Sequence, residues 1–367
     1  MVSDSKAFSG CWCYLLGRVS VRILAPIMIL MTFLVIILGG IIRIYDAGES
    51  CPDWPKCFGT WGFDISEEDQ GIWYEENPNE IDSRGSSHRY TTFQIFTEWI
   101  HRFVAGVILG PLVLFNRWLA SREGRSSEVK FASTVAVIMI IIQGMIGWLT
   151  VKMDNENWSV VIHLGNALLF TLSLIWIWVA AMKEEGKLIK LFRLDEKYNS
   201  KWKARLFWMS FGTLITLFSG TFVSTTPGAN LSCGVNGLFG SWPLCNGYFA
   251  ERIENIVDQS QMIHRWFVVL MQIALFWLSY KIWEENSESN SDGNLRFWIW
   301  SSTGVYFTNI LMGAFYVLSW TLDNGHIEIL SLIHLLFATI SFLLLATASL
   351  LLALNTKKEM NYRALET

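Results

Sequence analysis

Residues 98–115 read EWIHRFVAGVILGPLVLF, and residues 261–278 read QMIHRWFVVLMQIALFWL. Both stretches place a His-Arg pair before a long apolar run. Two further motifs recur around them in the same order: Cys51-Pro-Asp-Trp-Pro-Lys-Cys57 with Cys233 … Trp242-Pro-Leu-Cys245, and His163-Leu-Gly-Asn-Ala167 with His334-Leu-Leu-Phe-Ala338. Three motifs repeated in one order indicate a tandem duplication, so we expect two similar halves.

The composition indicates that lipid is the solvent of both halves. Of the 367 residues, 52% are hydrophobic and 16% are charged, whereas soluble proteins carry about 25% charged residues. Eight apolar stretches reach the roughly 20 residues that a membrane-spanning helix needs, at 22–43, 98–119, 131–151, 160–182, 204–225, 262–283, 297–320 and 328–354. Because a span in lipid must satisfy its backbone internally, we predict an all-α integral membrane protein with eight transmembrane helices.

The two copies are separated by four spans, an even number. They are therefore predicted to form two tandem pseudo-symmetric four-helix bundles, related by a pseudo-two-fold axis along the membrane normal. Lys and Arg gather in 117–130 and 183–205, so the positive-inside rule puts these loops and both termini in the cytoplasm. The predicted divisions are an N-terminal segment 1–21, a first half 22–182, a basic linker 183–203, a second half 204–354 and a tail 355–367.

The sequence before the first span resembles neither kind of targeting segment. The first span is too long for a signal peptide, and the opening residues are not an Arg-rich amphipathic stretch. We therefore expect neither a cleaved signal peptide nor a transit peptide.

The outer loop at 44–95 is much longer than a connection requires. Acidic residues dominate its middle, at Asp64, Glu67, Glu68, Asp69, Glu75, Glu76, Glu80 and Asp82. It is either a solvated acidic cap, or a docking surface for a partner or a lid over a site. The net charge of −4, with no basic stretch interleaved with aromatic residues, gives no indication of a nucleic-acid partner.

Four of the six histidines begin the even-numbered spans at their outer ends: His101, His163, His264 and His334. The other two, His88 and His326, fall in outer loops and are predicted to be ordinary surface residues. Polar groups at one depth in a bilayer are expensive and usually functional. Each imidazole could bridge neighbouring helices by hydrogen bonds. Two facing imidazoles per half are also a common way to hold haem iron from both sides, with a second acceptor on each Nδ1–H.

Charged residues beside these histidines have two interpretations each. Arg102 and Arg265 follow their histidines directly, and Arg43 ends the first span. Each could contact a haem propionate, or extend its side chain to the outer headgroups. Glu98 lies one helical turn before His101, while its counterpart Gln261 cannot exchange protons. This difference predicts that protons are handled in the first half only, unless Glu98 serves as a structural ion pair with Arg102.

The four outer cysteines are predicted to form two local disulfides, Cys51–Cys57 and Cys233–Cys245, because both pairs face an oxidising compartment and are close in sequence. A redox role in the reaction stays an alternative, since exposed local disulfides can be labile. Cys11 and Cys13 are expected to be reduced and incidental.

The combined motifs resemble those of haem A synthase over residues 22–354. Gly39-Gly40-x-x-Arg43, the Cys51–Cys57 loop, Glu98-x-x-His101-Arg102, Gly147-x-Leu149-Thr-Val151 and His163-Leu are similar to its first half. Gly220, Trp242-Pro-Leu-Cys-Asn-Gly247, His264-Arg265 and His334-Leu-Leu are similar to its second half. Two features depart from the pattern of this family. One is the long acidic loop. The other is the spacing of Cys233 and Cys245, which have eleven residues between them, whereas the first-half pair has five.

The resemblance implies oxidation of the ring methyl of haem O to the formyl group of haem A by successive hydroxylations. It assigns a haem b cofactor to His264 and His334, the substrate haem to His101 and His163, and the catalytic acidic role to Glu98. Membrane lipid, haem O, a haem O synthase (a farnesyl transferase) and an electron donor are the expected partners. The expected location is a bacterial plasma membrane, or alternatively a mitochondrial inner membrane.

Two other functions fit the same residues. A di-haem b electron carrier would hold a permanent haem in each half. A proton-coupled transporter would use the histidines as a relay without haem.

Overall fold

The computed structural model describes residues 19–194, 198, 200–249, 256–287 and 293–363. Cys11, Cys13, Lys197 and the last four residues lie outside this part of the chain. Within the described part the backbone forms helices and isolated β-bridges but no strand. The helices are α2 (Val21–Ile44), α3 (Glu67–Glu76), α4 (Thr92–Arg102), α5 (Gly110–Arg122), α6 (Ser127–Lys152), α7 (Asn157–Glu184), α8 (Ser200–Thr225), α9 (Ile256–Ser287), α10 (Asn294–Leu318) and α11 (Glu328–Arg363), with a π-helical segment η2 (Phe103–Leu109) and short 3-10 turns at Pro78–Glu80 and Lys190–Phe192.

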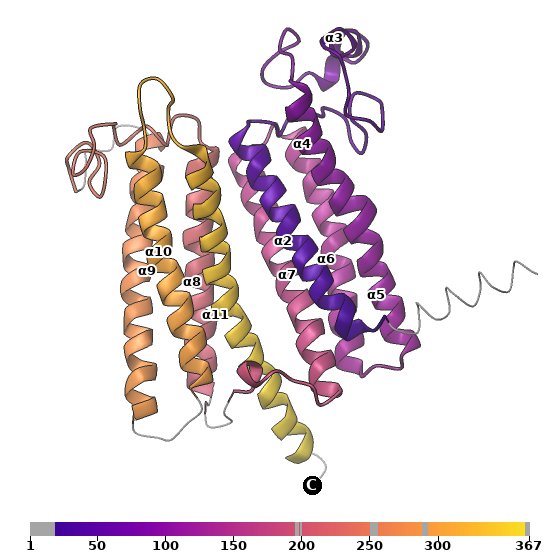
Figure 1. Cartoon of the computed structure of the whole chain (residues 1–367), viewed down its shortest axis with the longest axis vertical. Helices are drawn as coiled ribbons and strands as arrows, with labels where there is room; N and C mark the ends of the chain where they lie inside the picture. Colours follow the sequence, from indigo (N-terminus) through magenta and orange to yellow (C-terminus); the bar gives the residue numbers. More distant parts are fainter. Residues whose placement is uncertain (1–18, 195–197, 199, 250–255, 288–292, 364–367) are drawn as a thin grey trace, which may run out of the picture.

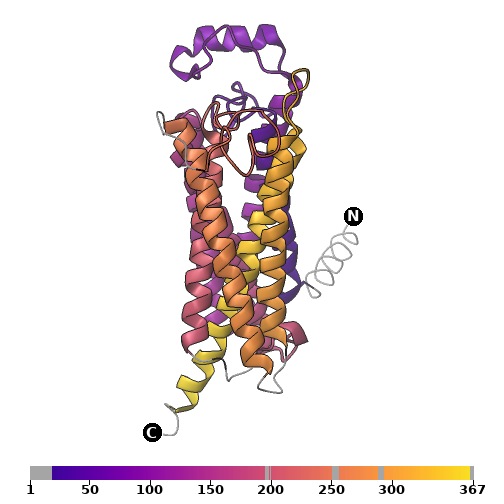
Figure 2. The same ribbon diagram turned by 90° about the vertical axis from the view of Figure 1, so that its left-hand side faces the viewer.

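The long helices form two bundles side by side (Figure 1). α2, α4 with α5, α6 and α7 make the first, and α8 to α11 make the second. α2 begins and α11 ends at the same end of the molecule, opposite the loops that carry α3, and the turned view shows both bundles aligned along one axis (Figure 2). This arrangement agrees with the predicted tandem repeat.

Helices α2 and α7 of the first bundle pack against α8 and α11 of the second. Their shared core includes Ile36, Leu168, Leu217 and Phe342. Close approach depends on a small residue: a Cβ on Gly165 of α7 would lie 2.6 Å from the ring of Phe218 on α8. Lipid gives little hydrophobic driving force between helices, so such tight packing is what joins the halves.

Seven helices within the described residues are long and apolar enough to cross a membrane, so this is a multi-pass membrane protein. The eighth predicted span, 297–320, is formed by α10, which is 25 residues long. α10 contains Ser301, Ser302, Thr303, Thr308 and Asn309, and it is not among the seven. Its length and its place in the second bundle are those of a span, but its composition alone does not identify it.

The helix that carries His101 is not uniform. The capping box of Thr91 with Gln94 starts α4 six residues before the predicted span. His101 therefore lies in the third turn of the helix and not at its start. His264 likewise lies in the third turn of α9. Just after Arg102 the backbone becomes π-helical, and the amide of Gly110 donates to the Ala105 carbonyl. Pro111 follows and has no amide to donate, which favours such a widened turn.

The outer loop folds into a small cap, defined here as residues 45–91. Tyr74 and Tyr90 are buried in its core together with both cysteines of the first disulfide. The buried amide of Gln70 donates to the Tyr90 carbonyl at 2.9 Å and accepts from the Tyr90 amide at 2.8 Å, which ties α3 to the end of the cap. Ser66 caps α3, and its first turn is acidic, as the helix dipole favours. The cap is therefore more than a solvated acidic loop.

At the other end of the first bundle, Glu185 gathers three cations. It accepts from Arg22 and Arg125 at 2.7 Å each and from Lys187 at 3.2 Å. This network joins the start of α2, the α5–α6 turn and the end of α7. Burial alone would raise the pKa of Glu185, but the hydrogen bonds from Arg125, Lys187 and Arg22 outweigh it and lower the pKa to about 2.

Because the folded-state pKa of Glu185 lies below its ordinary value, its contribution to stability is present above about pH 4.5 and is lost as the pH falls through about 2. The Glu185→Gln variant should lower the unfolding free energy at neutral pH by about 1 kcal/mol. Thermal unfolding in detergent, followed by circular dichroism, measures this. Glu184→Gln is the control, because within the described part of the chain Glu184 accepts only one long bond, from the Ser126 amide at 3.3 Å. Equal effects in the two variants would contradict the network's role.

Candidate functional site

Each of the four membrane histidines packs its ring against a glycine on the preceding helix. In the first half, a Cβ on Gly39 would lie 3.5 Å from Cε1 of His101, and one on Gly147 would lie 3.2 Å from Cε1 of His163. In the second half, a Cβ on Gly220 or Gly313 would lie 2.9 Å from Cε1 of His264 or His334. A Cβ at Gly220 or Gly313 would displace the imidazole and one at Gly147 would crowd it, whereas the distance at Gly39 is that of an ordinary van der Waals contact. The repeat therefore includes four glycine–histidine contacts, two in each bundle.

In the second half, both imidazoles donate their Nδ1–H to an acceptor. His334 Nδ1 lies 2.9 Å from the Asn309 carbonyl oxygen, and His264 Nδ1 lies 2.9 Å from Ser219 Oγ. The Ser219 hydroxyl hydrogen is directed to the Thr216 carbonyl at 2.7 Å, so its oxygen is free to accept. These bonds place the proton on Nδ1 and leave the Nε2 lone pair of each ring available for a metal.

The two rings of the second half also have a spacing suited to an iron between them. The His264 and His334 ring centroids are 6.4 Å apart, and the rings are perpendicular at 88°. Two metal–nitrogen bonds of about 2 Å each, together with half the width of each ring, put axial imidazole centroids about 6 Å apart. The separation of the two imidazoles is therefore compatible with one metal ion between them, as in a haem that both histidines ligate.

The first half holds its rings differently. The position of Ser219 is taken by Leu38, and Nδ1 of His101 is buried without a normal hydrogen bond among the described residues, although the Val35 carbonyl lies nearby. His163 instead meets an amide donor: Nε2 of Gln143 lies 3.2 Å from both of its ring nitrogens. The two bundles thus share histidines and glycines but differ in what holds the rings.

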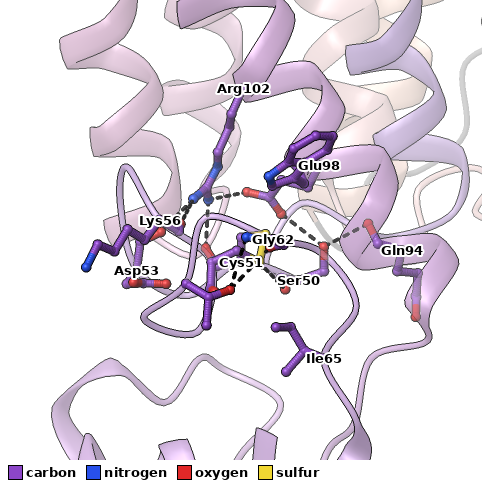
Figure 3. The surroundings of a disulfide bond; sticks show 12 residues. Ser50, Cys51, Asp53, Lys56, Gly62, Ile65, Gln94, Glu98 and Arg102 are labelled. Carbon is purple, nitrogen blue, oxygen red and sulfur yellow. Dashed lines mark hydrogen bonds and ion pairs between the residues drawn. A yellow bond between two sulfur atoms is a disulfide. The ribbon is translucent and has the colours of Figure 1, made fainter. Parts of the chain in front are cut away.

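Glu98 is held at the boundary between α4 and the cap, with 4% of its surface exposed. Ser50 Oγ lies 3.2 Å from one carboxylate oxygen, and the Arg102 guanidinium forms an ion pair with the other. Arg102 also donates to the carbonyls of Cys51 at 2.7 Å, Asp53 at 2.5 Å and Lys56 at 2.8 Å. Figure 3 shows Arg102 between the carboxylate and this loop, which the Cys51–Cys57 disulfide closes.

The second half repeats this arrangement with an amide in place of the carboxylate. Gln261 Oε1 accepts from Arg265 at 3.3 Å and lies 3.4 Å from Ser232 Oγ. Arg265 donates to the Leu244 carbonyl at 2.6 Å, in the loop that the Cys233–Cys245 disulfide closes. The geometry is therefore conserved between the halves while the chemistry differs at one side chain.

Both arginines beside the histidines serve as anchors of the outer loops in this structure. Neither extends away to the headgroups, because the guanidinium of each is engaged by loop carbonyls. Arg43 donates to the Ser224 carbonyl across the interface between the bundles, and its side chain is 46% exposed. The two loop histidines are half-buried, His88 against Tyr90 and His326 stacked on Tyr316.

The sequence profile of the cytochrome oxidase assembly protein family matches residues 22–347. The chain belongs to this family. Among curated relatives, the haem A synthase of Lysinibacillus sphaericus is 24% identical over 325 residues, which cover 86% of this chain and 91% of that protein. The haem A synthase of Flavobacterium johnsoniae is 26% identical over 319 residues, covering 78% and 86%. The haem A synthase of Shewanella oneidensis is 31% identical over 156 residues, covering 42% and 44%. These similarities confirm the resemblance that the motifs predicted.

The cap of this family member carries a buried carboxylate of its own. Glu49 is 7% exposed and forms an ion pair with Arg84 Nε at 3.3 Å. Burial raises the pKa of Glu49 to about 7; Arg84 opposes this rise, while Asp82, Asp154 and Asp46 add to it. The folded cap therefore favours the protonated form of Glu49.

Because the pKa of Glu49 in the folded cap lies above its ordinary value, the protonated side chain stabilises the cap at low pH. That stability is lost as the pH rises through about 7. From about pH 5.5 to about pH 8, hydrogen-exchange protection factors in residues 45–91 should fall, and Glu49→Gln should remove this dependence. Glu75→Gln is the control, because Glu75 is exposed on α3. A wild-type cap with pH-independent protection would rule out this role of Glu49.

Proposed function

We propose that the protein is a haem A synthase that oxidises the ring methyl of haem O to a formyl group by successive hydroxylations. The main support is one changed side chain within a repeated set of three residues beside the outer loops. The first half has the set Ser50, Glu98 and Arg102, and the second half has the matching set Ser232, Gln261 and Arg265. Only the first set contains a carboxylate, which can exchange protons. Membership of the family and the haem A synthase relatives support the same activity.

In this proposal the second half holds the haem b cofactor through His264 and His334. The acceptors Ser219 and the Asn309 carbonyl orient both rings and make them better ligands, since such partners typically change metal affinity by about 10–100-fold. When bound, haem b supplies the one-electron and oxygen chemistry that side chains lack. Arg265 of the second half and Arg43, which reaches across from α2 of the first bundle, are the proposed propionate contacts.

The substrate haem lies between His101 and His163 in the first half. Glu98 is one turn from His101 on the same helix face, so its carboxylate borders the substrate. Oxidation of a methyl group with O₂ consumes protons, and the role of Glu98 is to exchange them. Arg102, which was predicted as a propionate contact, uses four donors on Glu98 and the disulfide loop; we assign it to holding that carboxylate in place.

The proposed topology has eight spans, with both termini in the cytoplasm and the haem sites near the outer face of a bacterial plasma membrane. The basic segments at 117–130 and 183–205 support this orientation. Haem O would come from a haem O synthase, and electrons from a separate donor.

Replacing the carboxylate of Glu98 by an amide makes the first half chemically like the second. Glu98→Gln should therefore lower haem A formation by at least about 100-fold, the upper part of the range for a group that transfers protons. The haem b absorption spectrum should stay unchanged. Pyridine-haemochrome analysis of purified protein and of membranes measures haem type and amount together.

The exposed cap variant Glu75→Gln is the matched control and should retain full haem A formation. Unaltered haem A in Glu98→Gln would refute the assignment of Glu98. Two equivalents of haem b with no haem O or haem A in wild-type protein would favour the di-haem electron carrier.

The glycine–histidine contacts give a separate test of the haem b site. Gly313→Ala would place a Cβ 2.9 Å from His334 Cε1, whereas Gly304 on the same helix has no atom within 4 Å of its Cβ position. Gly313→Ala should lower haem b affinity roughly tenfold by displacing a ligand, and Gly304→Ala should leave it unchanged. Haem titration monitored at the Soret band measures both. Equal affinities in the two variants would argue against His334 as a ligand.

A further inference from the structure

A tyrosine crosses the core of the second bundle, farther from the outer loops than the histidine pair. Tyr306 lies on α10 seven residues before Gly313, so the two share one face of the helix and are about 10 Å apart along its axis. The Tyr306 hydroxyl is hydrogen-bonded to the Thr216 side chain on α8 and lies 3.5 Å from the Val268 carbonyl oxygen on α9. Tyr306 thus connects three of the four helices of this bundle.

We call Tyr306 and Thr216 the brace. Each of the two residues is 5% exposed. Thr216 lies four residues before Gly220 on α8, which is about 6 Å along the helix. Since Gly220 and Gly313 contact the two histidines, each member of the brace lies inward of one glycine–histidine contact. The brace therefore closes the interior of the bundle beyond the histidine pair.

The first bundle has smaller or apolar side chains at the matching positions. Counted from the glycines that contact the histidines, Thr216 corresponds to Val35 and Tyr306 corresponds to Ile140. Both Val35 and Ile140 are half-buried, and neither side chain can form a hydrogen bond. Ala105 stands where the second half has a valine, four residues after the histidine. The core of the first bundle is therefore not bridged at this level by these side chains.

The two haems of the proposed function differ on the edge away from their propionates. On that edge haem O carries a long farnesyl chain, where haem b has a short vinyl group. Apolar side chains can cover such a chain without loss, whereas a chain that displaces a buried hydrogen bond leaves polar atoms unpaired. The matching positions of the two bundles thus differ in the property that distinguishes the two haems.

We propose that the brace keeps haem O out of the second site, and that Val35, Ala105 and Ile140 admit its farnesyl chain in the first. This proposal rests on the proposed function, in which the two halves hold different haems. With the propionates toward the outer arginines, the opposite edge of each haem faces the interior of its bundle. There the brace blocks a long chain but not a vinyl group, so each half takes its own haem.

The test measures which haem a site retains rather than activity. The second site is isolated in a full-length variant with His101→Ala and His163→Ala, produced in haem-deficient cells. The protein is incubated in detergent with equal amounts of protohaem and haem O, freed of unbound haem, and extracted, and the retained haem is identified by reversed-phase chromatography. Protohaem should predominate. Adding Tyr306→Ile and Thr216→Val, which copy the first half, should raise the ratio of haem O to protohaem roughly tenfold.

Tyr280→Ile and Thr308→Val are the matched controls in the same variant. Tyr280 is 51% exposed on α9, and Thr308 is exposed on α10. Both undergo the same chemical change as the brace, but outside the bundle core, so the ratio of haem O to protohaem should not change.

The reciprocal change tests the first site, isolated by His264→Ala and His334→Ala. There Ile140→Tyr should lower the ratio of haem O to protohaem roughly tenfold. This arm also decides the case in which Tyr306→Ile leaves a cavity and prevents folding, which circular dichroism detects.

A ratio that stays unchanged in a folded brace variant or in folded Ile140→Tyr protein would overturn the proposal. So would a second site with its brace intact that takes haem O as readily as protohaem. Failure of the proposed function is a different result, namely wild-type protein that forms no haem A. Haem preference at an isolated site and haem A formation are separate measurements.

Discussion

The interior of each bundle depends on a close contact between an imidazole edge and a glycine on the adjacent helix. With a side chain at Gly220 or Gly313, the neighbouring ring would collide with it at 2.9 Å. The contact sets how deep the ring lies and which way it faces, and the hydrogen bonds on Nδ1 follow from that placement. The same contact occurs four times, so the two halves have the same frame before any difference between them matters.

The differences between the halves lie in the groups around this frame. Ser219 and the Asn309 carbonyl accept from the second-half imidazoles, whereas the first half has Leu38 at one position and the donor Gln143 at the other. Glu98 and Gln261 differ by one group within matching sets of partners. The two halves thus differ in the groups around their histidines and in one titratable side chain, without any change of fold.

Much of this arrangement could be predicted from the sequence, because long apolar runs and repeated His-Arg and Cys motifs are local signals. The tandem bundles and the histidine pairs followed from them. Gly313 was missed, since no motif surrounds it and only its contact with His334 shows its role. The Gln143–His163 contact and the Tyr306–Thr216 brace join separate helices and depend on side-chain rotation. The core of the cap was also missed, because Gln70 and Tyr90 lie far apart in a segment whose composition is dominated by acidic residues.

Arg102 has one further consequence for how the protein responds to its surroundings. It connects a buried carboxylate at the edge of the membrane to three carbonyls of a loop on the aqueous side. A displacement of that loop would break these contacts and would change the surroundings of the Glu98 carboxylate. The buried carboxylate is therefore coupled to the loop outside the bundle through two side chains, Arg102 and Ser50.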